Sequence, residues 1–342
     1  MTEVVVVGLD IAKHVFQAHG ADGSGAKLFN RKLSRGQVLK FLASLSPCIV
    51  AMEACSTSQY WAREIEKLGH TPRLIPPQYV KPYVKRQKND ATDAEAIAEA
   101  AMRPTMRFVT HKSAEKHADG MLFRGRDLLV RQRSQLINAL RGHFAEYGFI
   151  EPPGLASVKR LRAYLEQPDL DIPDMAQTVL NLLLGQIDIL TAKMVELDEA
   201  IAKRAKADEL TRRLMTIPGI GRITAMAISA LAPPASVFEK GRDFAAWIGL
   251  TPQQHSSGGK ERLGRITKKG NTTLRRLLVI CASSRVKAVV RFGVDGGAWL
   301  TGLLSRKPRM VAITALANKL ARMVWAMSIS GASYKTPEAS VA

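Results

Sequence analysis

The chain has 342 residues, of which 46% are apolar, and this is enough for two domains with separate cores. Its charge is unusual, because 50 Lys and Arg against 30 Asp and Glu leave a net charge of +20. Such an excess favours a polyanionic partner, most often nucleic acid, over a basic but unspecific surface. The three cysteines are odd in number and lack metal-ligand spacing, which argues for a reducing compartment and against a disulfide framework. No apolar run has the length of a membrane span.

Residues 1–110 alternate between strand and helix patterns. Short apolar runs predict strands, and longer segments with helical spacing predict helices. The strands are expected at Val4–Val7, His14–His19, Lys27–Leu33, Cys48–Glu53 and Arg73–Pro77, and the helices at Gln37–Leu45, Ser56–Leu68 and Asp90–Met102. This order predicts an α/β domain with a mixed sheet.

Residues 111–208 have a different pattern, with apolar residues three and four positions apart. The spacing predicts long helices over Met121–Phe144 and Met175–Ala205, separated by breaks around Pro152 and from Pro168 to Pro173. An apolar stripe of this length is typical of a core or of a coiled-coil partner face. We therefore expect a coiled-coil-like helical spacer that also serves in oligomerisation.

Residues 209–330 predict a mostly helical C-terminal domain, and residues 331–342 have the composition of a disordered tail. Positive charge is concentrated in this last domain. Between His255 and Trp325 there are 15 Lys and Arg, opposed only by Glu261 and Asp295. Such a surface is suited to contacts with phosphate groups.

Four carboxylates stand at positions that favour metal binding. Asp10 and Glu53 each follow an apolar strand, and a carboxylate there is costly unless a cation compensates it. Asp90 and Asp93 lie three residues apart at the start of a helix and so share one face. Carboxylate oxygens suit Mg²⁺ or Mn²⁺, and two such ions serve phosphodiester chemistry. Each acid alone also fits an ordinary role, such as a turn residue or a helix cap.

Three segments carry a family resemblance. Gly8–Lys13, Glu53–Ser56 and Lys88–Ala94 together resemble the DEDD transposases of the insertion sequence 110 family. The resemblance implies an RNase H-like (RuvC-like) fold for residues 1–110. It also implies that Asp10, Glu53, Asp90 and Asp93 are the metal-binding catalytic acids.

A turn in the C-terminal domain extends the resemblance. Ile217–Gly221 resembles both a helix-hairpin-helix turn and a motif of the family's transposase domain. Gly219 and Gly221 would let backbone N–H groups approach a phosphate at a helix N-terminus. The ordinary alternative is a plain turn between two helices.

The segment Gly249–Lys260, followed by Gly264–Asn271, has the composition of a flexible, basic, glycine-rich loop. The resemblance implies that this loop carries a nucleophilic serine, and alignment from Gly249 places that serine at Ser257, with Ser256 as the alternative. His255 would act as a base or contact a phosphate. Further phosphate contacts are expected from Lys260, Arg262, Arg265, Lys268, Lys269, Arg275 and Arg276.

The implied function is that of a DNA transposase and recombinase using Mg²⁺ and a transient phosphoserine. It would act on double-stranded DNA in the bacterial cytoplasm at the nucleoid, with no role for a membrane. An element-encoded bridge RNA would guide it, and a dimer or tetramer would combine acids and serine from different subunits. Two alternatives remain open: a RuvC-like metal-dependent nuclease without a covalent intermediate, and a non-catalytic nucleic-acid-binding protein.

Overall fold

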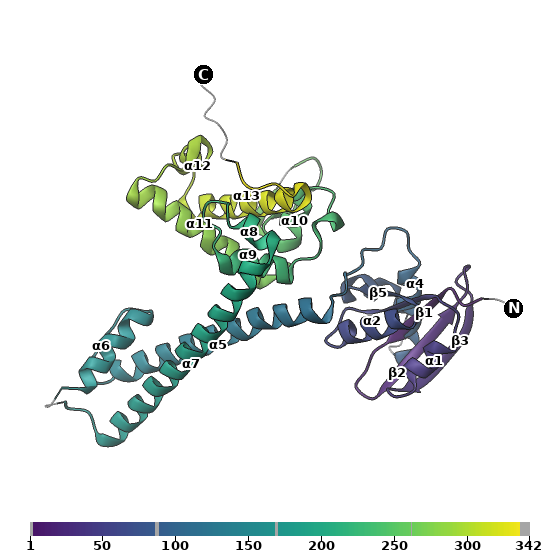
Figure 1. Cartoon of the computed structure of the whole chain (residues 1–342), viewed down its shortest axis with the longest axis horizontal. Helices are drawn as coiled ribbons and strands as arrows, with labels where there is room; N and C mark the ends of the chain where they lie inside the picture. The colour runs from purple at the N-terminus through teal and green to yellow at the C-terminus, as the bar shows by residue number, and fades with distance from the viewer. Residues whose placement is uncertain (1–2, 86–88, 168–169, 261, 336–342) are drawn as a thin grey trace. The chain divides into compact units, whose positions relative to one another are not determined.

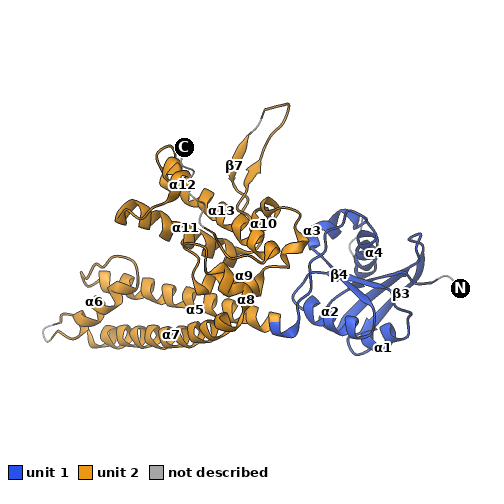
Figure 2. Cartoon of the chain, turned by 45° about the horizontal axis from the view of Figure 1, so that its top comes forward, with its two compact units in different colours: residues 1–115 blue, residues 116–342 orange. Residues whose placement is uncertain are grey.

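The computed structural model describes residues 3–85, 89–167, 170–260 and 262–335. Its chain divides into two compact units, Met1–Glu115 and Lys116–Ala342 (Figure 2). The second unit contains both the predicted helical spacer and the predicted C-terminal domain. Each unit has its own core, and each is described separately below.

Unit 1 is built on a five-stranded mixed sheet with the order β3-β2-β1-β4-β5. Strands β1, β2 and β3 are antiparallel neighbours, whereas β4 runs parallel to β1 and β5 parallel to β4. The strands are β1 Val6–Asp10, β2 Val15–Ala21, β3 Lys27–Ser34, β4 Ile49–Glu53 and β5 Thr71–Ile75; the helices are α1 Val38–Ala43, α2 Ser58–Lys67, α3 Pro77–Val80, η1 Lys81–Tyr83 and α4 Asp90–Ala101 (Figure 1).

Helices cover both faces of this sheet because its central strands are apolar on both sides. Val7 and Leu9 of β1 belong to a core with α1 and α2. Val6, on the opposite face, belongs to a core with the alanine-rich helix α4. The apolar runs of the sequence predicted this α/β architecture, with a first strand at Val4–Val7. In the structure the strand extends to Asp10, which is therefore a strand residue rather than one in the following turn.

Unit 2 begins with two long helices, α5 Ala114–Ala145 and α7 Asp174–Ala207, which are joined through α6 Leu155–Leu165. Their far end has a core of its own around Leu140, Phe144 and Leu184. At the near end, Phe123 and Ile201 belong to the same core as the C-terminal helices. The predicted long hairpin is thus present, and part of it is an integral layer of the C-terminal core.

The rest of unit 2 is a cluster of helices around α9, α11 and α13, with one small hairpin. Its elements are α8 Glu209–Leu214, α9 Arg222–Leu231, η2 Ala235–Val237, α10 Gly241–Ile248, β6 Pro252–Gln254, β7 Leu263–Ile266, α11 Thr272–Phe292, α12 Gly297–Leu304 and α13 Arg309–Ser330 (Figure 1). The flexible loop predicted after Gly249 is instead a two-stranded hairpin. Strands were missed because they are only 3 and 4 residues long and largely exposed, so they lack an apolar pattern.

The tail predicted to be disordered is anchored where it leaves α13. Arg213 donates from Nη1 to the carbonyl oxygen of Gly331 at 2.8 Å, and the backbone N–H of Tyr334 donates to Thr216 Oγ1 at 2.9 Å. The rest of that tail, residues 336–342, lies outside the described residues.

Two described helices, α7 and α13, are long and apolar enough to cross a membrane by length and composition alone. Helix α13 packs in the core of unit 2, with 44% of its most apolar window buried. Core helices of soluble proteins commonly have this composition, so the feature is weak evidence for a membrane span.

Candidate active site

Asp10 and Glu53 occupy matching positions on neighbouring strands. The parallel register pairs Val6, Val7 and Gly8 of β1 with Ile49, Val50 and Ala51 of β4. Continued by two residues, this register brings Asp10 level with Glu53, each the last residue of its strand. Side chains alternate along a strand, so Asp10 lies on the same face as Gly8, which is the face covered by α4.

Helix α4 reaches this face because β1 has no side chain at Gly8. A Cβ at Gly8 would lie 2.1 Å from the carbonyl oxygen of Ala94 and 2.6 Å from the backbone nitrogen of Ala98. The helix begins at a capping box, in which Asn89 accepts from the Thr92 backbone N–H at 2.9 Å. Asp90 and Asp93 lie in the first turn, where the helix dipole favours negative charge.

The structure thus places two acids at strand ends and two on the helix that packs against the same sheet face. Among the residues that the structure describes, however, no three His, Cys, Asp or Glu side chains are close enough to hold a metal ion together. The four acids are therefore not gathered around one point. Their oxygen donors match the preference of Mg²⁺ and Mn²⁺, and the shared sheet face is compatible with a common ion.

A buried histidine lies next to Gly8 on the same sheet face. His19 of β2 pairs with Gly8, is 4% exposed, and its Nδ1 has no hydrogen-bond partner among the described residues. Burial lowers the pKa of His19; nearby Glu95 opposes this effect, while Lys27 and Lys85 reinforce it. A single histidine in a strand carries no distinguishing pattern, so the sequence alone does not predict this residue.

Ser256 and Ser257 lie at the tip of the β6–β7 hairpin and have different surroundings. The Arg262 backbone N–H donates to Ser256 Oγ at 3.2 Å, so this hydroxyl helps to close the hairpin. Ser257 begins a tight turn in which its carbonyl oxygen accepts from the Lys260 N–H at 3.1 Å. Among the described residues, the Ser257 hydroxyl has no hydrogen-bond partner; Glu261 lies outside them.

Glycines determine the shape of this hairpin at its tip and at its base. Gly258 and Gly259 both have positive φ, 57° and 76°, as a type I′ turn requires. At the base, Gly249 and Gly270 also have positive φ, and a Cβ at Gly270 would lie 1.7 Å from the Trp247 carbonyl oxygen. The base of the hairpin is therefore tightly packed, and the two serines lie near the opposite end of this short hairpin.

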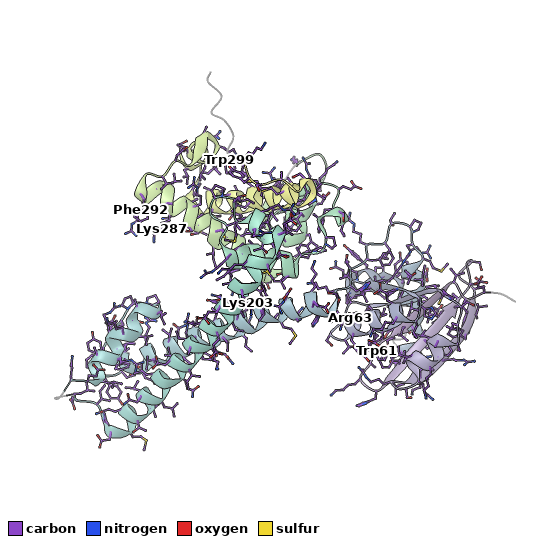
Figure 3. All side chains as sticks on the ribbon, in the orientation of Figure 1. Trp61, Arg63, Lys203, Lys287, Phe292 and Trp299 are labelled. Atoms are coloured by element: carbon purple, nitrogen blue, oxygen red, sulfur yellow. The ribbon has the colours of Figure 1, made fainter. Side chains whose placement is uncertain are left out.

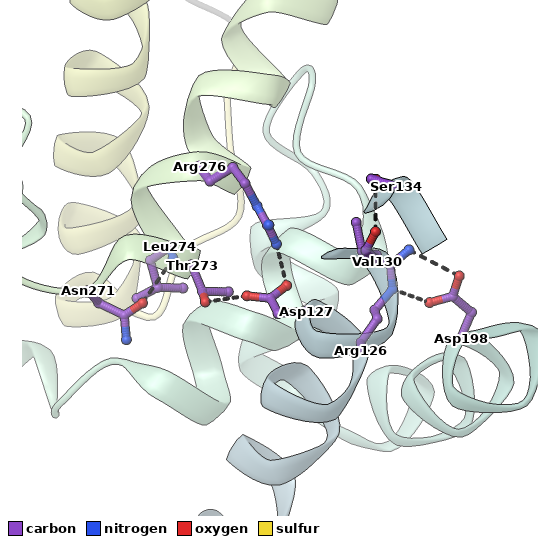
Figure 4. A network of polar contacts seen from close by, with 9 residues as sticks. All are labelled: Arg126, Asp127, Val130, Ser134, Asp198, Asn271, Thr273, Leu274 and Arg276. Atoms are coloured by element: carbon purple, nitrogen blue, oxygen red, sulfur yellow. Dashed lines mark hydrogen bonds and ion pairs between the residues drawn. The ribbon is translucent and has the colours of Figure 1, made fainter. Parts of the chain in front are cut away.

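Two of the seven predicted phosphate contacts are engaged within the fold. Arg275 donates from Nη1 to the carbonyl oxygens of Ile248 at 2.9 Å and Lys269 at 2.8 Å. Burial lowers the pKa of Arg275. The other is Arg276, which forms an ion pair with Asp127 of α5 (Figure 4). Both residues hold elements of unit 2 together through these contacts, and their binding to phosphate stays a prediction. The remaining five are exposed: Lys260, Arg262, Arg265, Lys268 and Lys269.

The predicted turn at Ile217–Gly221 joins α8 to α9 and packs on α11. Gly219 has a φ of 93°, and a Cβ there would lie 3.5 Å from the Cys281 carbonyl oxygen. Gly221 is the residue before α9, and a Cβ there would meet open space. The positive φ thus requires a glycine at position 219. At Gly221, before the start of α9, no described atom lies within 4 Å of the position that a Cβ would take.

Two sequence matches cover most of this structure. Residues 7–149 match the DEDD transposase domain of IS110 elements, and residues 211–292 match the family described as "Transposase IS116/IS110/IS902 family". A Sinorhizobium fredii protein with a transposase name is 45% identical over 98% of this chain and 87% of its own length. The chain belongs to the IS110 family of transposases.

Two further relatives match this chain over nearly its whole length. The transposase for insertion sequence element IS1328 from Yersinia enterocolitica is 39% identical over 97% of this chain and 98% of its own length. That for IS1111A from Coxiella burnetii is 38% identical over 98% and 92%. The resemblance noted in the sequence is thus confirmed. The DEDD match indicates an RNase H-like fold for unit 1, in keeping with its central mixed sheet.

Proposed function

We propose that this transposase cleaves and rejoins mobile-element DNA with Mg²⁺ or Mn²⁺ held by Asp10, Glu53, Asp90 and Asp93. The observation that carries the proposal is the β1–β4 register, which brings Asp10 level with Glu53 on the sheet face covered by α4. A bound divalent cation would stabilise the charge that develops on the reacting phosphate. The four carboxylates repel one another, so they approach a common point only when a cation compensates them.

We propose Ser257 as the nucleophile. Its Oγ would form a bond to a DNA phosphorus as one bridging P–O bond breaks, and the released strand end would become a hydroxyl. Rejoining would reverse this step: a strand-end hydroxyl forms a new P–O bond and the Oγ–P bond breaks. The number of phosphate ester bonds is conserved throughout, so no external energy source is needed. The hydrogen bond that Ser256 Oγ accepts from the Arg262 backbone N–H supports Ser257 over Ser256 as the nucleophile.

A serine hydroxyl is a weak nucleophile until a base or a cation activates it. His255 precedes the two serines and would accept the proton or contact the phosphate. The exposed residues Lys260, Arg262, Arg265, Lys268 and Lys269 would bind the DNA backbone without reading its sequence. We propose that an element-encoded RNA supplies sequence choice by base pairing, as the family resemblance implies. The net charge of +20 supports a second polyanionic partner.

We also propose that the protein works as a dimer or tetramer in which the acids and the serine come from different subunits. Support comes from exposed apolar side chains along α7. Met175, Leu182 and Ile189 are exposed there at intervals of seven residues, and Val179 is exposed between them. A seven-residue repeat of apolar side chains is the pattern of a coiled-coil seam.

The covalent step is tested by trapping. The purified protein is incubated with element-end DNA and Mg²⁺, denatured, digested with trypsin and examined by mass spectrometry for a nucleotide-modified serine. We expect the modification on Ser257, and we expect Ser257→Ala to form no adduct. Ser256→Ala is the matched control, and it should still form the adduct in reduced yield because the hairpin loses one hydrogen bond. An adduct that persists in Ser257→Ala and disappears in Ser256→Ala would show that Ser256 is the nucleophile.

The acid site is tested separately by metal titration. Asp10→Asn should lower strand cleavage at least a hundredfold at any Mg²⁺ concentration, because a neutral amide is a poorer ligand for a hard cation. The exposed acid Glu66 on α2 provides the control, and Glu66→Gln should leave cleavage unchanged. Full cleavage activity of Asp10→Asn in Mg²⁺ would contradict the proposed metal site. Cleavage by the wild type without any adduct would instead favour a nuclease.

A further inference from the structure

The end of unit 2 formed by the last turns of α11, helix α12 and the start of α13 has exposed aromatic and apolar side chains. Phe292 is 70% exposed and Trp299 is 41% exposed. Both lie at the same end of the unit (Figure 3). The same segment has further exposed apolar residues: Val290, Val294, Met310 and Val311. A cluster of this kind on a protein surface marks a binding site more often than chance.

The same surface is strongly basic. The end of helix α11, residues 285–292, contains Arg285, Lys287 and Arg291 and no acid. Exposed cations of the same segment, residues 285–311, are Lys287, Arg291, Arg306, Lys307 and Arg309. The only acid between Arg285 and Val311 is Asp295, whose carboxylate accepts from the Gly297 N–H at 2.8 Å and so is used within the turn. The charge therefore favours an anionic ligand and opposes a basic or neutral protein face.

One of the two rings is held in place by a cation. The Lys319 Nζ lies 4.1 Å from the centre of the Trp299 ring, which fastens the ring of α12 to α13. Gly296, just before α12, is in close contact with Val289 of α11, because a Cβ there would lie 3.1 Å from a Val289 methyl group. Helix α12 is thus packed on α11 and α13, and Trp299 is positioned before any ligand arrives.

We propose that this surface, comprising Phe292, Trp299, Lys287, Arg291 and Arg306, binds a single-stranded nucleic acid whose bases stack on the two rings. Exposed rings within a cationic field are the combination that such strands use, because every base has a face for stacking and every nucleotide carries a phosphate. Duplex DNA satisfies only the cations, since its bases are already stacked. The inference rests on the proposed function in that strand exchange and a guide RNA both supply unpaired strands.

The test is equilibrium binding of the full chain, carrying Ser257→Ala and kept in EDTA so that no chemistry occurs. The probes are a fluorescent 20-nucleotide strand of mixed sequence, as DNA and as RNA, an abasic strand of the same length, and a duplex. Phe292→Ala should raise the Kd for the mixed strand about tenfold, as expected for loss of one stacked base, and leave the abasic strand and the duplex unchanged. An effect on DNA or on RNA alone would support the proposal and identify the strand.

Further variants test the contribution of the cations and provide controls at positions outside the proposed surface. Lys287→Gln with Arg291→Gln should weaken the mixed and abasic strands equally and reduce the slope of log K against log salt by about 1.4. Ile150→Ala and Lys203→Gln make comparable changes to exposed residues elsewhere in unit 2 and should have no effect. The proposal fails if Phe292→Ala binds the mixed strand like the wild type, or if it changes only self-association, which would make the surface a protein interface. Because the assay uses EDTA and lacks Ser257, its result is independent of the proposed acid site and nucleophile.

Discussion

Gly8 is the residue on which the placement of α4, and therefore of Asp90 and Asp93, depends. The helix backbone occupies the space that any side chain at position 8 would need. Backbone atoms cannot rotate away as a side-chain tip does, so a substitution there displaces the whole helix. The carboxylates of the first turn move with it, and stability and metal binding should change together.

We expect Gly8→Ala to destabilise unit 1 by about 3 kcal/mol, near the upper end for overpacking a core. The measurement is thermal unfolding combined with amide hydrogen exchange, in which α4 should lose protection. Gly36→Ala is the matched control, because a Cβ at Gly36 meets nothing within 4 Å. Equal melting temperatures for the two variants would contradict the close packing of β1 and α4.

His19 should make the stability of unit 1 depend on pH. Burial lowers its pKa in the folded state below the ordinary value of 6.5, so the unfolded chain binds more protons as pH falls. The stabilising contribution is complete above pH 6.5 and is lost as pH falls below that value. We expect urea midpoints to decrease between pH 7.5 and 5 in the wild type and to decrease less in His19→Asn. Identical pH profiles would show that His19 does not titrate in this range.

At the scale of elements, the connection between α5 and α11 is polar and partly buried. Asp127 is 8% exposed; its carboxylate pairs with Arg276 and accepts from Thr273 Oγ1 at 2.5 Å (Figure 4). One residue earlier, Arg126 pairs with Asp198 of α7 at 2.5 Å. Adjacent residues of α5 thus attach it to two other helices, one of which begins where the serine hairpin ends.

We expect Asp127→Ala to lower the free energy of unfolding of unit 2 by about 2 kcal/mol, because it leaves Arg276 and Thr273 without their acceptor. This corresponds to a fall in Tm of roughly 4–8 °C for a unit of this size. Asp188→Ala removes another aspartate–arginine pair, with Arg162, in which both side chains are largely exposed. That variant should change stability by less than about 0.5 kcal/mol. A similar loss in both would mean that burial of Asp127 has no special effect.

At the scale of the whole molecule, the proposed sharing of acids and serine between subunits requires self-association, for which the exposed apolar residues of α7 are the proposed surface. A charge placed in an apolar seam should prevent it. We expect Leu182→Glu to shift the protein to monomers in sedimentation velocity and to abolish strand exchange. Asn181→Glu adds the same charge at an exposed neighbouring position of the helix and should remain associated. If Leu182→Glu keeps the oligomeric state of the wild type, this face of α7 is not the surface through which the protein self-associates.

The sequence by itself determined the features that depend on local pattern. Short apolar runs placed Asp10 and Glu53 at the ends of strands, helical spacing placed Asp90 and Asp93 on one turn, and three short motifs indicated the family. Only the tertiary structure decided that β1 and β4 are parallel neighbours in a register that aligns Asp10 with Glu53. It also decided that Ser256 closes a hairpin and that Arg275 and Arg276 are engaged within the fold. These are contacts between distant segments, and they depend on how the whole chain packs rather than on the preferences of any one segment.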